Sequence, residues 1–150
     1  MVDAAFGFHP DPDNPGWFAR KPTSLVRFMD FYGDMYAWPL DATRACIRVH
    51  PQPHHLNGTG RIHGGFTLGL IDQCLFIGPS AVGVERVFGG STIDSATQFL
   101  AALNADAPID TIVELMRETH RMIFVRGTVE QAGVVGASFT GTLKKASARP

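Results

Sequence analysis

The sequence has few cysteines, few charged residues and no block of like charge, and each scarcity excludes a class of function. Its two cysteines, Cys46 and Cys74, form no CxxC pair, so neither a redox motif nor a cysteine zinc site is supported. Charged residues make up 18% of the 150 residues and the net charge is -1. Nothing in this charge pattern indicates an electrostatic nucleic-acid binder.

We also expect neither a secretion signal nor a membrane-spanning segment. Met1 to Asn14 has neither the basic region nor the apolar region of a secretion signal, which favours a cytoplasmic location. The longest apolar stretch, Ile62 to Val82, contains Asp72, Gln73 and Pro79, and these argue against a membrane span. We therefore expect no membrane partner.

A metal or another cofactor has little support either. His50, His54 and His55 are spaced closely enough to share a metal ion, but no acidic or cysteine partner stands near them. We predict no metal site and no cofactor.

The composition, with 45% hydrophobic residues, suits one domain with a packed core. Residues 1–22 hold four of the ten prolines and predict an irregular N-terminal arm, which leaves residues 23–150 as a single domain. Thr23 or Ser24 is placed to cap a short helix over Leu25 to Phe31, and Gly33 is placed to end it.

Alternation of apolar and polar residues predicts six strands around one buried helix. The clearest case is the last strand, where Val135, Ala137 and Phe139 alternate with polar or small residues. Strands are predicted at Met35–Leu40, Ala42–His50, Ser91–Ala102, Asp110–Thr119, His120–Gln131 and Val134–Lys145, and the helix at Ile62–Val82. A hairpin turn is predicted at 131–133. The order implies an α+β fold in which an antiparallel sheet wraps around the helix.

Asp72 is the one charged residue in the apolar helix. A carboxylate is costly to desolvate, so Asp72 is paired, faces a polar cleft, or is kept neutral, and each of these is common at functional sites. A buried structural carboxylate that bonds a loop or an arginine is the alternative.

A glycine-rich segment, Asn57 to Gly65, leads into the same helix. The first turn of a helix has free N–H groups, and Gly64 and Gly65 let a ligand approach them closely, as in an anion or oxyanion site. Close packing of the helix on the sheet is the alternative reason for two glycines. His63 and Asp72 are nine residues apart, about 13–14 Å along a helix at roughly 1.5 Å per residue. If the helix start and Asp72 are both catalytic, the site lies at a two-fold interface between subunits.

Asn57, then His63-Gly64-Gly65, then Asp72, followed by a run of antiparallel strands, resembles the hotdog-fold acyl-CoA thioesterases of the phenylacetate-pathway (PaaI-like) type. The segment Glu118 to Gly127 is also similar to a hairpin of that family. The resemblance covers roughly residues 24–145. It implies a hotdog fold, a homodimer or homotetramer, and hydrolysis of acyl-CoA thioesters without a metal.

The resemblance also implies roles for individual residues. The Gly64 N–H would polarise the thioester carbonyl, and Asp72 of the other subunit would attack it or activate a water. Asn57 would position that water or the substrate, His63 would support the helix start, and Thr92 would offer a hydroxyl. Substrate contacts are expected from Gly65 and Arg61 at the glycine-rich entry and from Phe66 and Phe99 in the acyl pocket.

Three other interpretations stay open. One is an acyl-CoA-binding hotdog module without catalysis, since fold does not fix function. Another is a hotdog enoyl-CoA hydratase or dehydratase, in which His63 and Asp72 supply the acid and base across an interface. The third is a structural domain without a small-molecule ligand.

Overall fold

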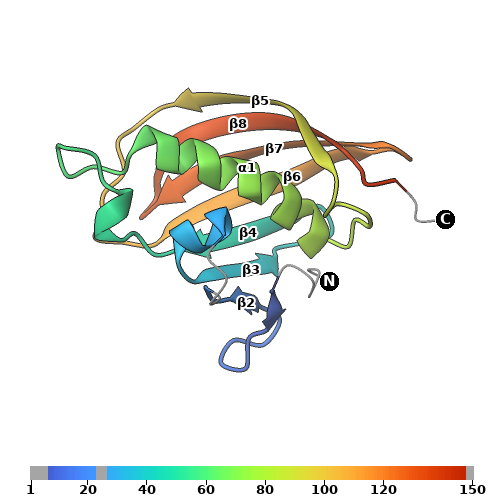
Figure 1. Ribbon diagram of the computed structural model, residues 1–150, viewed down its shortest axis with the longest axis horizontal. Helices are drawn as coiled ribbons and strands as arrows, with labels where there is room; N and C mark the ends of the chain where they lie inside the picture. Colours follow the sequence, from blue (N-terminus) through green and yellow to red (C-terminus); the bar gives the residue numbers. More distant parts are fainter. Residues whose placement is uncertain (1–6, 23–26, 148–150) are drawn as a thin grey trace.

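The computed structural model describes residues 7–22 and 27–147, in which one long helix lies across a curved antiparallel sheet (Figure 1). The helix is α1 (Gly64–Ala81), and the strands are β1 (His9–Pro10), β2 (Phe18–Arg20), β3 (Met35–Pro39), β4 (Arg44–Val49), β5 (Ser91–Phe99), β6 (Ile109–Glu118), β7 (Met122–Gln131) and β8 (Val134–Lys144). Two 3-10 helices, η2 (Phe28–Tyr32) and η3 (Pro53–His55), precede α1. The strand order in the sheet is β1-β2-β3-β4-β6-β7-β8-β5.

The predicted α+β architecture is confirmed. Each of the six predicted strands and the central helix is present, and the largest difference is at the end of β5, which stops at Phe99 instead of Ala102. The predicted hairpin between β7 and β8 turns at Ala132 and Gly133, whose φ angles of 49° and 81° suit a tight two-residue turn.

The N-terminal arm contains two short strands that the sequence did not predict. In β2, Phe18 to Arg20 pairs with β3, and β1 pairs with β2, so the arm extends the sheet edge. Trp17 stacks on Trp38 of β3 with ring centroids 3.9 Å apart. The prediction of an irregular arm is therefore wrong for these segments. Strands of two and three residues are too short to show a period of two.

The predicted short helix is present in part. Its proposed caps, Thr23 and Ser24, lie outside the described residues. Phe28 to Tyr32 forms a 3-10 helix, and Gly33 follows it with a φ of 71°, a conformation that glycine adopts easily.

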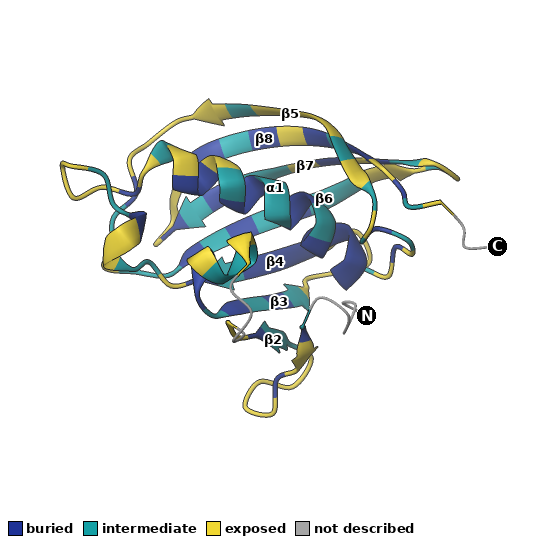
Figure 2. Ribbon diagram, viewed as in Figure 1, coloured by how far each residue is buried: buried dark blue, intermediate teal, exposed yellow. Residues whose placement is uncertain are grey.

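The core lies between α1 and the concave face of the sheet (Figure 2). Ala45, Ile47 and Val49 of β4 are buried toward it, as their alternation requires. On α1, Gly78 lets the helix approach β6 so closely that an added Cβ would lie 2.6 Å from Val113 Cβ. The helix is buried on most of its surface, which explains its apolar composition.

Strand β5 holds an exposed edge of the sheet. Among the described residues it pairs with β8 alone, and most of its side chains are exposed. Ile93 and Phe99 are each 55% exposed, which is unusual for large apolar side chains on an edge strand. The start of β5 lies beside α1 and so brings the strand's side chains to the middle of the helix.

Candidate functional site

The start of α1 presents a free backbone donor. His63 is the N-cap residue, and its Nδ1 accepts a hydrogen bond of 2.8 Å from the Gly65 N–H. The Thr67 N–H donates to the His63 carbonyl at 3.2 Å. Gly64 is the first helical residue, and no described residue accepts a hydrogen bond from its N–H. This donor is left available by the geometry of a helix start.

Phe99 of β5 lies close to Gly64. A Cβ built on Gly64 would lie 3.5 Å from Phe99 Cζ, which is ordinary van der Waals contact. Gly64, Thr67 and Phe99 line an open pocket of about 340 Å³ together with the chain at 100–103. The structure thus brings the predicted residues Gly64 and Phe99 together at one pocket.

Asp72 lies two helical turns further along α1 and is half-buried. The Thr92 hydroxyl of β5 donates a hydrogen bond of 2.8 Å to Asp72 Oδ1. Thr92 lies just before an irregularity in the β5–β8 pairing, between Thr92 and Asp94. The structure therefore brings into contact two predicted site residues that are 20 positions apart in sequence.

Asn57 organises the loop before α1. Its Oδ1 accepts hydrogen bonds from the Thr59 N–H at 2.9 Å, the Thr59 hydroxyl at 2.7 Å and the Arg61 N–H at 3.1 Å. Within the described part of the chain, no hydrogen bond joins Asn57 to Gly64 or Asp72. The exposed Arg61 side chain donates to Asn104 Oδ1 at the loop surface.

Phe66 and Gly65 also take definite places. Phe66 is buried, with its ring 4.3 Å from that of His55 and 5.3 Å from that of Tyr32, measured between centroids. The Phe66 side chain is therefore part of the core of this subunit, and its place in an acyl pocket stays a prediction. Gly65 is exposed, and its N–H donates a hydrogen bond to His63 Nδ1.

His55 is a buried residue that no local pattern distinguishes from His50 and His54. Its Nε2 donates to the Phe31 carbonyl at 2.7 Å, and its Nδ1 accepts from the Gln52 N–H at 3.0 Å, so the ring is neutral with the proton on Nε2. Burial lowers the pKa of His55. Its carbonyl accepts the His63 N–H at 2.9 Å, which ties η3 to the helix start.

The other candidate chemistry is limited. Within residues 7–22 and 27–147, no three His, Cys, Asp or Glu side chains form a group that could hold a metal ion. Cys46 and Cys74 are free and buried, and burial raises the pKa of the Cys74 thiol to about 12. No helix in the described ranges is long and apolar enough to cross a membrane.

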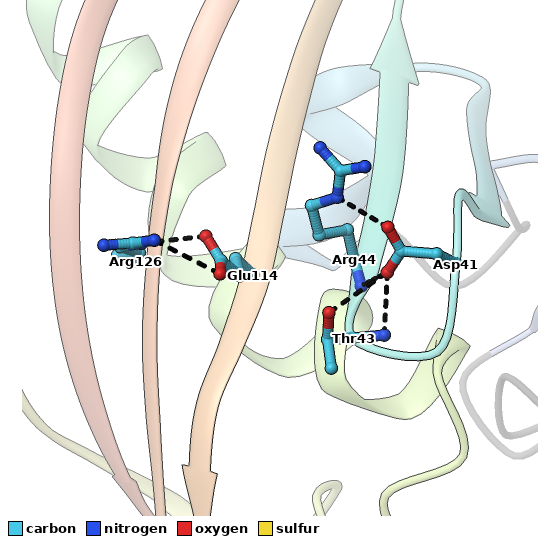
Figure 3. A network of polar contacts seen from close by, with 5 residues as sticks. All are labelled: Asp41, Thr43, Arg44, Glu114 and Arg126. Carbon is cyan, nitrogen blue, oxygen red and sulfur yellow. Dashed lines mark hydrogen bonds and ion pairs between the residues drawn. The ribbon is translucent and has the colours of Figure 1, made fainter.

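Ion pairs between Arg126 and Glu114 and between Arg44 and Asp41 lie on the sheet face that points away from α1 (Figure 3). Arg126 of β7 donates to Glu114 of β6 at 2.8 Å, and Arg44 of β4 donates to Asp41 at 2.7 Å. The Thr43 N–H and Arg44 hold the pKa of Asp41 well below its usual value. A wide hollow of about 620 Å³ lies over this face. The cations that line it, Arg44 and Arg126, already form ion pairs with Asp41 and Glu114.

Comparisons with known proteins give structural matches alone. No family model matches the chain, and no curated protein matches its sequence. A point mutant of the phenylacetic acid degradation protein PaaI from Thermus thermophilus is similar, with a TM-score of 0.65, 23% identity, and coverage of 79% of this chain and 97% of that chain.

Two streptococcal structures also match and carry a ligand. A hypothetical thioesterase protein from Streptococcus pneumoniae, solved with coenzyme A, has a TM-score of 0.66 at 18% identity and covers 77% of this chain and 88% of that chain. The protein smu.793 from Streptococcus mutans, bound to acetyl CoA, has a TM-score of 0.67 at 16% identity and covers 85% and 98%. The matches include PaaI and thioesterase-superfamily proteins, and the chain has the hotdog fold that the sequence resemblance implied.

Proposed function

We propose that this protein hydrolyses acyl-CoA thioesters to a free acid and CoA, in a site formed between two subunits. The observation that carries the proposal is the hydrogen bond from Thr92 to Asp72, which fixes the one charged side chain of α1 in the middle of the helix. Hotdog neighbours with coenzyme A or acetyl CoA bound support an acyl-CoA ligand.

The spacing of the two reactive groups supports a shared site. Gly64 and Asp72 are eight residues apart on α1, about 12 Å at roughly 1.5 Å per residue, which is too far for one carbonyl group to contact both. A two-fold axis that sets two α1 helices antiparallel brings Gly64 of one subunit to Asp72 of the other.

The surface around the site suits such a dimer. The β5 edge is open, with Ile93 and Phe99 exposed, and Leu68 is 48% exposed on α1 between Gly64 and Asp72. Pairing two β5 edges buries unpaired backbone groups as well as this apolar surface.

The proposed mechanism follows from the position at which negative charge develops during the reaction. As the thioester carbonyl becomes tetrahedral, its oxygen gains negative charge, which the Gly64 N–H and the helix dipole stabilise. Asp72 removes a proton from an attacking water, or attacks the carbonyl carbon itself to give a mixed anhydride that water then hydrolyses. In both routes the carbon–sulfur bond breaks and CoA leaves as its thiolate, which is then protonated. A single turnover in heavy-oxygen water separates the routes, because only the anhydride route can label the carboxylate of Asp72.

The test is thiol release from a panel of acyl-CoAs by the wild-type protein, by Asp72→Asn, and by the control Asp13→Asn in an exposed turn of the arm. The buried thiols of Cys46 and Cys74 keep the background with a thiol reagent low. We expect Asp72→Asn to reduce kcat by about 10²–10⁴-fold. Thiol release unaffected by Asp72→Asn would remove the basis of the proposal. Tight acyl-CoA binding without turnover would favour the binding module, and a change in enoyl-CoA absorbance without thiol release would favour the hydratase.

A further inference from the structure

A second pocket lies next to Asp72, one turn further along the helix. It measures about 320 Å³ and is lined by Phe76 and Ile77 of α1, by Phe88 and Gly89 before β5, and by Met29 of η2, with Gln73 as its one polar side chain. Gln73 directly follows Asp72, and Gly90, also at the pocket, is two residues before Thr92. Both members of the Asp72–Thr92 pair therefore have close chain neighbours in the lining of the pocket.

Met29 differs from the other lining residues in its origin. The others belong to α1 or to the segment that leads into β5, whereas Met29 is on η2, close to the N-terminal arm. Its neighbour Asp30 forms an ion pair of 2.5 Å with Arg20 of β2, and the two side chains are only 6% and 4% exposed. Because a buried ion pair fixes the relative position of its two segments, the arm holds η2, and with it Met29, against α1.

We propose that this pocket receives the acyl group, and that the arm sets the acyl preference by positioning Met29 as one wall. The proposal rests on the proposed function, since it places the acyl group next to the carboxylate that attacks its thioester. The volume lies at the small end of ligand pockets, which span roughly 300–1,000 Å³, and apart from Gln73 the lining side chains are apolar. The substrate class is therefore a compact apolar acyl group, such as an aromatic or medium-chain one, in preference to a long fatty acyl chain.

The first test changes the pocket wall. The kcat/KM values of Met29→Trp, Met29→Ala and the wild type are compared for acetyl-, butanoyl-, hexanoyl-, octanoyl-, dodecanoyl- and phenylacetyl-CoA. Met116→Ala is the matched control, because Met116 is 50% exposed on β6 and outside the pocket. Filling the pocket in Met29→Trp is expected to lower kcat/KM for the preferred acyl group by at least about tenfold while acetyl-CoA changes less than about twofold.

The opposite change is expected from enlarging the pocket. Met29→Ala should shift the preference toward longer chains by about tenfold relative to the wild type. A uniform effect of either variant on every acyl group, or the wild-type profile in both, would overturn the assignment of the pocket.

The second test addresses the arm. Arg20→Met removes the cation that pairs with Asp30, and we expect it to change the ratio of kcat/KM values between acyl groups. Arg20→Lys, which keeps the charge, should restore the wild-type ratio at least in part. A purely structural role would lower activity for all acyl groups by the same factor. If Arg20→Met fails to fold, as thermal unfolding will show, the Met29 variants still decide the assignment of the pocket.

A separate measurement distinguishes this proposal from the proposed function. Acyl-CoA analogues in which a thioether replaces the thioester cannot be hydrolysed, and their dissociation constants are measured by calorimetry for the same chain lengths. If no acyl-CoA is hydrolysed, the proposed function fails, yet a chain-length preference in binding that changes in the Met29 variants still supports the pocket. If acyl-CoAs are hydrolysed but the binding preference is the same in the Met29 variants as in the wild type, the assignment of the pocket alone is overturned.

Discussion

Replacing Gly64 with proline removes a single hydrogen-bond donor from the proposed site. Gly64 is the first residue of α1, the position that proline tolerates best in a helix because the N–H there has no helical partner. The preceding residue, His63, has φ −70° and ψ 136°, the extended conformation that a residue before proline requires. The backbone therefore accepts Gly64→Pro without moving the helix start.

A side chain added at position 64 has room as well. A Cβ on Gly64 would meet Phe99 Cζ at 3.5 Å, which is ordinary contact. Gly64→Ala is thus a matched control that adds a side chain and keeps the N–H.

The expected loss follows from the role of the donor. Removing one oxyanion donor costs about 10²–10³-fold in kcat, or roughly 2.7–4 kcal/mol of transition-state stabilisation. We expect this loss in Gly64→Pro and less than about tenfold in Gly64→Ala, with little change in thermal unfolding for either variant. Thiol release from the best acyl-CoA gives kcat. Equal activity of the two variants would refute the reasoning, because they differ in the N–H.

Three further changes test neighbouring features. Thr92→Val removes the hydroxyl that donates to the site carboxylate; we expect kcat to fall roughly 10–100-fold, since such a bond is worth about 1.5–3 kcal/mol, with Thr92→Ser largely active. Gly78→Ala should lower the free energy of unfolding by about 1–3 kcal/mol in a denaturant titration, because the added methyl overlaps Val113, whereas Gly58→Ala, in open space, should not. Burial lowers the pKa of His55 from 6.5, so the unfolded state takes up the proton first, and stability should be full above pH 6.5 and fall as the pH drops below it. His55→Gln should flatten this fall in a series of thermal melts, and curves parallel to the wild type would assign it to other groups.

Much of the fold was predictable because its elements carry strong local patterns. The alternation in β8 and the long apolar run of α1 leave little choice of secondary structure. The strands of the arm were missed because pairing with the open edge of β3, rather than a pattern of their own, makes them strands. The place of β5 beside β8 was equally beyond local reasoning, since it depends on contacts across some 45 residues.

The candidate site was predictable to the extent that its residues break the local pattern. Asp72 stands out as the one charge in α1, and the resemblance supplied Thr92, which contacts it. Nothing local marked the Arg20–Asp30 pair or the wall that Met29 forms, because each depends on the arm folding back onto η2. Local reasoning cannot decide the role of Phe66, because an apolar residue at a helix start looks the same whether it faces a ligand or the core.

The most direct test of the central claim, a site shared between two subunits, is a mixed dimer of two inactive variants. Asp72→Asn and Gly64→Pro subunits carrying different tags are produced together, the mixed dimers are isolated with both tags, and thiol release is measured. In a mixed dimer, one site combines the intact Gly64 of one subunit with the intact Asp72 of the other, so we predict about half of the wild-type kcat per dimer. Activity no higher than that of either parent variant would contradict the account, because it would mean that both groups act within one chain or not at all.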